Sequence, residues 1–242
     1  MALSPERRAR RRDHLVEVAR TLIREGGDAG FSMAQLAERA GVSPATPYNL
    51  LGSKSEILGV VVRDDSQSFV AKLSTSRDAS ALTTLLAATN AVVAHYEQDL
   101  PFYRGLFGAA ARTDGKDLLN SMLAESRALW RLLVRAAVDS GELSNRLHVD
   151  PFTDVLLRMI AGTSAARFAG IWDGDRFRLE MSHAIRLLIA GVAMPPADRR
   201  LLEEILAVQA ALADALQPPH DPAQAERAAR VGVQAEAADG GA

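Results

Sequence analysis

The side chains best suited to recognise another molecule are gathered in one short stretch, residues 43–49. A helix over residues 43–51 would turn five of them outward, and such a helix is narrow enough to enter the major groove of DNA, about 12 Å wide. Hydroxyl and amide side chains can hydrogen-bond to base edges or hold the backbone in register. We therefore predict five DNA-reading residues: Ser43, Ala45, Thr46, Tyr48 and Asn49.

The residues around this stretch fit a helix-turn-helix, in which two short helices meet at a turn and the second stands clear of the core. Ser32 and Gln35 have the form of a capping box that opens a helix over residues 33–40, and Gly41 supplies the turn. Ala37 is small enough for the two helices to cross closely. The inner faces are expected to carry Leu36, Ala40, Val42 and Leu50.

Residues 10–60 resemble the DNA-binding domain of the tetracycline-repressor (TetR) family of bacterial transcription regulators. The resemblance rests on residues 19–27 (ARTLIREGG), 34–43 (AQLAERAGVS) and 46–58 (TPYNLLGSKSEIL). It implies that Thr46 touches bases or the sugar-phosphate chain, and that Tyr48 and Lys54 contact phosphate. Asn49 is the residue that we expect to read a base edge.

The second short helix departs from the family pattern at two places. Pro47 stands where the family usually has an aliphatic residue, and a proline there removes a backbone donor and presses on the carbonyl four residues earlier. We expect the helix to tighten or to begin late. Leu50 and Leu51 stand where the family often has His-Phe, so one usual phosphate contact is lost.

Helices are predicted along the rest of the chain, because alanine and leucine dominate and β-branched runs bounded by turns are scarce. Ser4 and Pro5 open the first helix, which Gly26 stops, and a capping box of Ser53 and Glu56 opens the fourth. Longer helices are expected over residues 79–98, 101–112, 117–140, 150–172, 176–192 and 197–216.

The predicted fold is therefore all-α, with three parts. Residues 1–63 would form the helix-turn-helix DNA-binding domain. Residues 64–216 would form a larger helical bundle for ligand binding and dimerisation. Residues 217–242 contain few large aliphatic side chains and are expected to form a disordered tail.

The resemblance also implies a small-molecule pocket among the middle helices. An apolar wall with a few polar groups would suit a hydrophobic effector. The candidate ligand-binding residues are His95, Phe102, Tyr103, Phe107, Arg127, Trp130, Phe168 and Trp172. The alternative for most of these side chains is that they simply fill the core.

The last long helices of the family typically pair with their twins in a dimer, which here would use the helices at about 150–172 and 176–192. Small residues at 161–166 would let helices approach closely, and residues 187–189 would add apolar area. Dimerisation would also let two recognition helices reach successive grooves about 34–36 Å apart on pseudo-palindromic DNA. The alternative is an ordinary core helix within one chain.

Charge and composition also bear on which partners the protein could bind and where it would act. The net charge is −2, but residues 1–63 hold ten Lys or Arg against seven Asp or Glu, and five arginines fall within residues 7–12. This density suits a phosphate backbone, and equally a solvated helix end. The longest apolar run is too short to span a membrane, and no signal peptide is recognisable, so a cytoplasmic protein is expected.

We therefore predict a homodimeric DNA-binding regulator, a repressor released from its operator by a hydrophobic ligand. The chain has no cysteine, its five histidines are widely scattered, and we expect neither a metal nor another cofactor. No catalytic residues are predicted. An all-α enzyme and a helical adaptor that binds proteins remain the alternatives.

Overall fold

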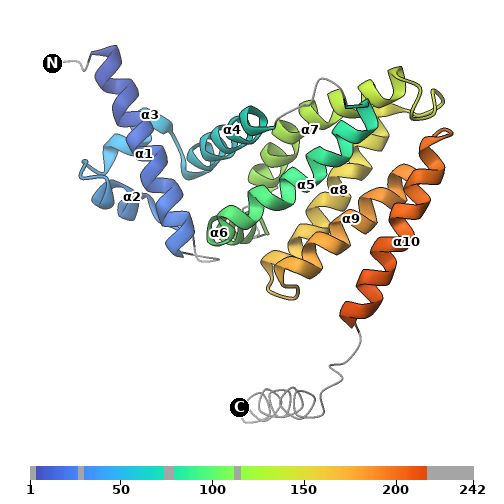
Figure 1. The fold of residues 1–242 in the computed structure, drawn as a ribbon. Helices are drawn as coiled ribbons and strands as arrows, with labels where there is room; N and C mark the ends of the chain where they lie inside the picture. Colours follow the sequence, from blue (N-terminus) through green and yellow to red (C-terminus); the bar gives the residue numbers. More distant parts are fainter. Residues whose placement is uncertain (1–3, 27–29, 74–78, 112–115, 217–242) are drawn as a thin grey trace, which may run out of the picture.

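The computed structural model describes residues 4–26, 30–73, 79–111 and 116–216, and these residues form ten helices (Figure 1). Apart from an isolated bridge between Leu143 and Ala193, the described part of the chain contains no β-structure. The prediction of an all-α fold is confirmed. The predicted tail, residues 217–242, lies outside the described residues.

The first four helices follow the sequence signals closely. They are α1 (Pro5–Gly26), α2 (Met33–Arg39), α3 (Ala45–Leu51) and α4 (Lys54–Lys72). The N–H of Arg7 donates to Ser4 Oγ, so Ser4 caps α1 as expected. Both predicted capping boxes are present, at Ser32 and at Ser53.

The remaining helices form the larger bundle: α5 (Ala81–Gln98), α6 (Leu100–Ala111), α7 (Lys116–Asp139), α8 (Val149–Phe168), α9 (Gly174–Ala190) and α10 (Ala197–Leu216). The prediction that α8 reaches residue 172 is wrong, because Gly170 adopts a left-handed conformation, φ 76°, and ends the helix. There the N–H of Ile171 donates back to the carbonyl of Ala166, which satisfies a helix-end carbonyl.

Two apolar clusters hold the molecule together. One lies inside the larger bundle and joins α5, α7, α8 and α9. The other joins the first four helices to α6, with Leu15 and Ile23 of α1 packed in the same cluster as Phe102 and Leu106. Helix α4 crosses the proposed domain boundary at residue 63 without a break, and Figure 1 shows it running from the N-terminal helices to the bundle.

Candidate DNA-binding surface and ligand pocket

Helices α2 and α3 are joined by a tight turn that fixes the angle between them. Gly41 has φ 63°, a backbone conformation that residues other than glycine adopt only at a cost in free energy. The N–H of Val42 donates to the carbonyl of Ala37. Leu36 and Ala37 of α2 are fully or almost fully buried. The turn and the buried face of α2 therefore hold the start of α3 in one orientation.

Helix α3 is anchored on one side and open on the other. Pro47 and Leu51, one turn apart, are its buried residues. Tyr48 is 56% exposed, Ser43, Ala45 and Asn49 are also exposed, and Thr46 is half-buried. The hydroxyls of Ser43 and Thr46 are hydrogen-bonded to each other at 2.8 Å. The structure thus brings all five predicted DNA-reading residues to one small surface.

Pro47 fits this helix without costing it a hydrogen bond. The helix begins at Ala45, so Pro47 lies in the first turn, where backbone N–H groups have no partner inside the helix. The carbonyl of Ser43 accepts from Thr46 N–H at 2.9 Å, in the tighter i to i+3 pattern. The proline ring is buried.

Lys54 lies in the first turn of α4, next to the end of α3. Its ammonium is 5.2 Å from the centre of the Phe31 ring. The neighbouring Glu56 closes the capping box, accepting from the backbone N–H of Ser53 at 2.7 Å. This hydrogen bond, with a second one from the Ser53 hydroxyl, holds the pKa of Glu56 below its usual value.

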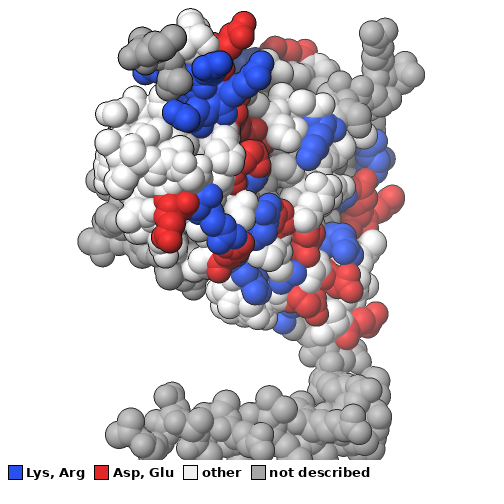
Figure 2. Space-filling view, turned by 90° about the vertical axis from the view of Figure 1, so that its left-hand side faces the viewer, with Lys and Arg blue, Asp and Glu red and all other residues white. Residues whose placement is uncertain are grey.

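Basic residues gather at the start of α1. The side chains of Arg7, Arg8, Arg10, Arg11 and Arg12 are all exposed. Figure 2, which looks at the side of the molecule with the N-terminal helices, shows basic residues near its upper edge and a broad uncharged area beside them. Residues 40–53 contain no charged side chain, so positive charge would be offered by α1 and Lys54 rather than by α3.

A cavity of about 90 Å³ lies among α4, α5, α6, α7 and α8. Three of the predicted ligand-binding residues line it: His95, Phe107 and Trp130. The other walls were not predicted from the sequence, because the capping box at Ser53 and Glu56 indicates only the start of α4 and not its end. The same helix face continues through Asp65, Ser66 and Phe69, which line the cavity, and α7 adds Glu125, Ser126 and Leu129.

The other five predicted ligand-binding residues do not line this cavity. Phe102 and Phe168 are buried in the cluster around α1 and α6, so they fill core, as the alternative interpretation held. Arg127 pairs with Asp154 at 2.7 Å between α7 and α8. Trp172 lies after the end of α8, with the Arg176 guanidinium 5.5 Å from its ring centre.

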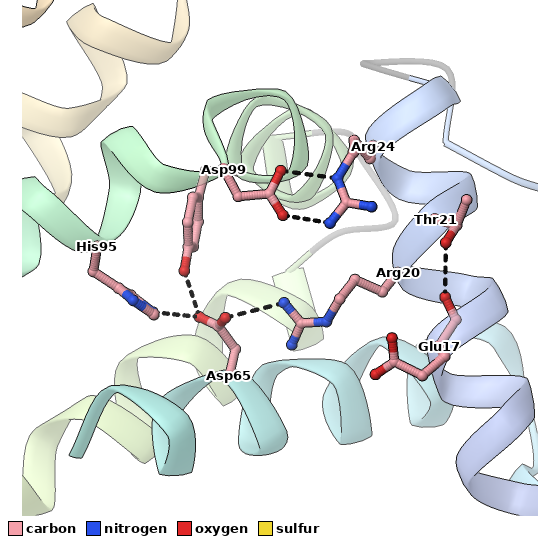
Figure 3. Close-up of polar contacts among 8 residues, drawn as sticks. Glu17, Arg20, Thr21, Arg24, Asp65, His95 and Asp99 are labelled. Atoms are coloured by element: carbon pink, nitrogen blue, oxygen red, sulfur yellow. Dashed lines mark hydrogen bonds and ion pairs between the residues drawn. The ribbon is translucent and has the colours of Figure 1, made fainter. Parts of the chain in front are cut away.

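Tyr103, the fifth, belongs to a polar cluster around Asp65 at the edge of the cavity. Figure 3 shows Asp65 of this cluster between His95 and Arg20. The Tyr103 hydroxyl donates to Asp65 Oδ2 at 2.8 Å, and His95 Nε2 lies 3.3 Å from the same oxygen. Arg20 of α1 donates to Asp65 Oδ1 at 3.2 Å. One carboxylate of α4 therefore links α1, α5 and α6.

The electrostatics of this cluster favour a charged Asp65. Burial alone would raise the pKa of Asp65, but the hydrogen bonds from His95 and Tyr103, together with the charge of Arg20, hold it below its usual value. Burial and the neighbouring carboxylate raise the pKa of the Tyr103 hydroxyl, which stays protonated as a donor. Asp65 thus lines the cavity and also forms an ion pair with Arg20 of α1.

Within the described ranges, no three His, Asp or Glu side chains lie close enough to hold a metal ion. No helix in the same ranges is long and apolar enough to cross a membrane.

Comparison with known proteins bears on both parts of the chain. Residues 15–61 match the family model described as bacterial regulatory proteins, tetR family. No curated protein sequence matches the chain.

Solved structures share the fold over most of the chain. RolR in complex with resorcinol superposes with a TM-score of 0.60 at 18% identity, covering 83% of this chain and 95% of RolR. The fatty acid degradation regulator FadR from Bacillus halodurans has a TM-score of 0.60 at 16% identity, covering 79% and 98%. The transcriptional repressor QsdR of R. erythropolis has a TM-score of 0.54 at 22% identity, covering 76% and 96%. Residues 15–61 thus match the tetR family model, and the described chain as a whole shares the fold of these solved structures.

Proposed function

We propose that the protein is a homodimeric repressor that binds a pseudo-palindromic DNA operator through α3 and leaves it when a small hydrophobic molecule binds the larger domain. The observation that carries the proposal is the two-sided character of α3. Pro47 and Leu51 fix its inner side, while Tyr48 and Asn49 stay open to a partner. The family match supports a DNA partner over an enzyme or a helical adaptor. Such a repressor would act in the cytoplasm.

The dimer interface is proposed on the outer sides of α8 and α9. Val155, Gly162 and Ala165 of α8 are exposed along one side of that helix, and Leu187 of α9 is 48% exposed. By contrast, Ser164 and Ile189 are fully buried within one chain. Small exposed residues allow helices of two copies to approach closely. Two linked copies would present two α3 helices to successive grooves of the duplex.

The ligand response is proposed to run through α4. This helix begins at Lys54, beside α3, and reaches the cavity at Asp65, eleven residues or roughly 16 Å further on. A ligand in the cavity would shift α4 and change the spacing of the two α3 helices. A coupling free energy of about 1–3 kcal/mol would change DNA affinity about 5- to 150-fold. RolR, which has the same fold, was solved with the small ligand resorcinol.

Fluorescence anisotropy with a selected operator tests the proposal. Lys54→Ala should weaken binding to all operators about equally and flatten the salt dependence, because a phosphate contact is lost. Asn49→Ala should relax the choice at one base pair. Lys72→Ala, an exposed lysine at the other end of α4, is the control and should bind like the wild type. Equal affinity and equal selectivity in all four proteins would contradict the proposal.

A further inference from the structure

The wall of the cavity carries two carboxylates but no lysine or arginine. Among the residues that line it, Asp65 and Glu125 are carboxylates, His95 lies against Asp65, and there is no Lys or Arg. The two carboxylates differ in how well hydrogen-bond and ion-pair partners neutralise their charge. Asp65 has Arg20, His95 and Tyr103 as partners.

The negative charge of Glu125 is only weakly neutralised by its neighbours. In the described part of the chain its ion-pair partner is Arg63, at 3.9 Å, and it accepts no hydrogen bond there. The Arg63 side chain is 46% exposed and that of Glu125 34%, so water weakens the pair further. The charge of Glu125 is therefore available to a molecule in the cavity.

Aromatic rings make up much of the remaining wall. Phe69, Tyr96, Phe107 and Trp130 come from four different helices. The rings of Tyr96 and Phe107 have centres 6.3 Å apart, and the Phe69 ring lies 5.1 Å from the His95 ring. The faces of such rings attract cations, more strongly where water is excluded. Rings and a carboxylate together favour positive charge on an otherwise apolar molecule.

The size and position of the cavity limit the molecule further. A volume of about 90 Å³ is smaller than the roughly 150 Å³ of a protein cavity known to hold benzene, so a single ring already requires the walls to move slightly. Val70, 47% exposed, and Glu125 both line the cavity and reach solvent, so its mouth lies between α4 and α7. A ligand could bury its ring and keep its charge near Glu125.

We propose that this cavity takes a compact organic cation, an aromatic or aliphatic ammonium compound, with Glu125 as its charge partner and the aromatic wall around its apolar part. The proposal rests on the ligand response proposed above and names the class of the effector. An organic anion of the same size would meet Glu125 and the faces of the rings unfavourably. A neutral molecule would gain the apolar contact alone.

Titration with three single-ring probes tests the proposal: benzylammonium, benzyl alcohol and benzoate. Binding is followed by thermal shift and by tryptophan fluorescence, to which Trp130 in the cavity wall contributes together with Trp172. For the wild type we expect the dissociation constant of benzylammonium to be about tenfold lower than that of benzyl alcohol, with benzoate binding weakest. In Glu125→Gln, which keeps shape and removes charge, the preference for the cation should fall to about twofold or less. The matched control is Glu203→Gln, an exposed glutamate of α10, which should keep the full preference.

Three results would overturn the proposal: benzyl alcohol or benzoate binding as tightly as benzylammonium, no saturable binding of benzylammonium, or an unchanged preference in Glu125→Gln. None of these measurements involves DNA. Operator binding by the same preparations therefore separates a failure of the ligand assignment from a failure of the proposed function.

Discussion

Asp65 shows how one side chain can connect two parts of a helical protein. Its oxygens accept hydrogen bonds from Arg20 of α1 and Tyr103 of α6, and its own helix, α4, begins beside the candidate DNA-binding residues of α3. The sequence predicted the exposed residues of α3 well, because a helix-turn-helix has a strong local pattern. It did not predict Asp65, whose partners are 30 to 45 positions away along the chain.

Replacing Asp65 with Asn should lower the free energy of unfolding at pH 7 by about 1–3 kcal/mol, because a part-buried hydrogen-bonded charge is lost. Urea denaturation measures this change. The control Asp64→Asn alters an exposed neighbour on the same helix and should change stability by no more than about 0.5 kcal/mol.

The effect of this substitution should also depend on pH. The folded protein holds the pKa of Asp65 below its usual value, so the charge stabilises the fold above the unfolded pKa of about 3.9. That stabilisation is lost as the pH falls through the lowered folded pKa. The difference between wild type and Asp65→Asn should therefore shrink on acidification, and a difference that grows would contradict the assignment.

Helices α1 and α6 pack unusually closely, and this contact joins the DNA-binding helices to the bundle. A Cβ atom added at Gly105 would lie 2.3 Å from the carbonyl oxygen of Ile23, so only glycine allows the approach. Beside it, Arg24 donates to both carboxylate oxygens of Asp99 (Figure 3). Caps and periodicity predicted most of the helix limits, although not the end of α8. They did not predict the packing of α1 against α6, because no local pattern indicates which distant helix a glycine will contact.

Substituting Gly105 with Ala should destabilise the protein by about 1–3 kcal/mol, since backbone must move to relieve the contact. Thermal and urea unfolding would measure the loss. Gly26→Ala, at the end of α1 with no atom within 4 Å of the added methyl, should change stability little. If both variants were equally stable, α1 and α6 would not pack as described.

The proposed assembly of two copies rests on the shape of the molecule as much as on its surface. Helix α10 packs along α9, where Arg186 donates to Glu204 at 2.8 Å, while the outer side of α8 and Leu187 stay uncovered in the single chain. Figure 1 shows α8, α9 and α10 at the end of the molecule away from the N-terminal helices. A dimer formed there would leave both α3 helices free.

In light-scattering measurements we expect the wild type to be a dimer and Leu187→Glu to be a monomer, because the substitution puts a charge into the proposed apolar interface. Leu132→Glu is the matched control, since Leu132 of α7 is 68% exposed and lies outside that interface. It should remain dimeric. A wild-type protein that is monomeric at micromolar concentration would contradict the proposed interface.

The central claim is that α3 reads DNA, and selection of binding sites from a random DNA pool tests it most directly. The wild type should enrich a pseudo-palindrome whose half-sites lie about 34–36 Å apart or at a multiple of that spacing, and Asn49→Ala should enrich the same palindrome with one base position relaxed in each half. An absence of any enriched sequence with the wild type, or an identical and equally sharp motif with Asn49→Ala and Tyr48→Ala, would contradict the account.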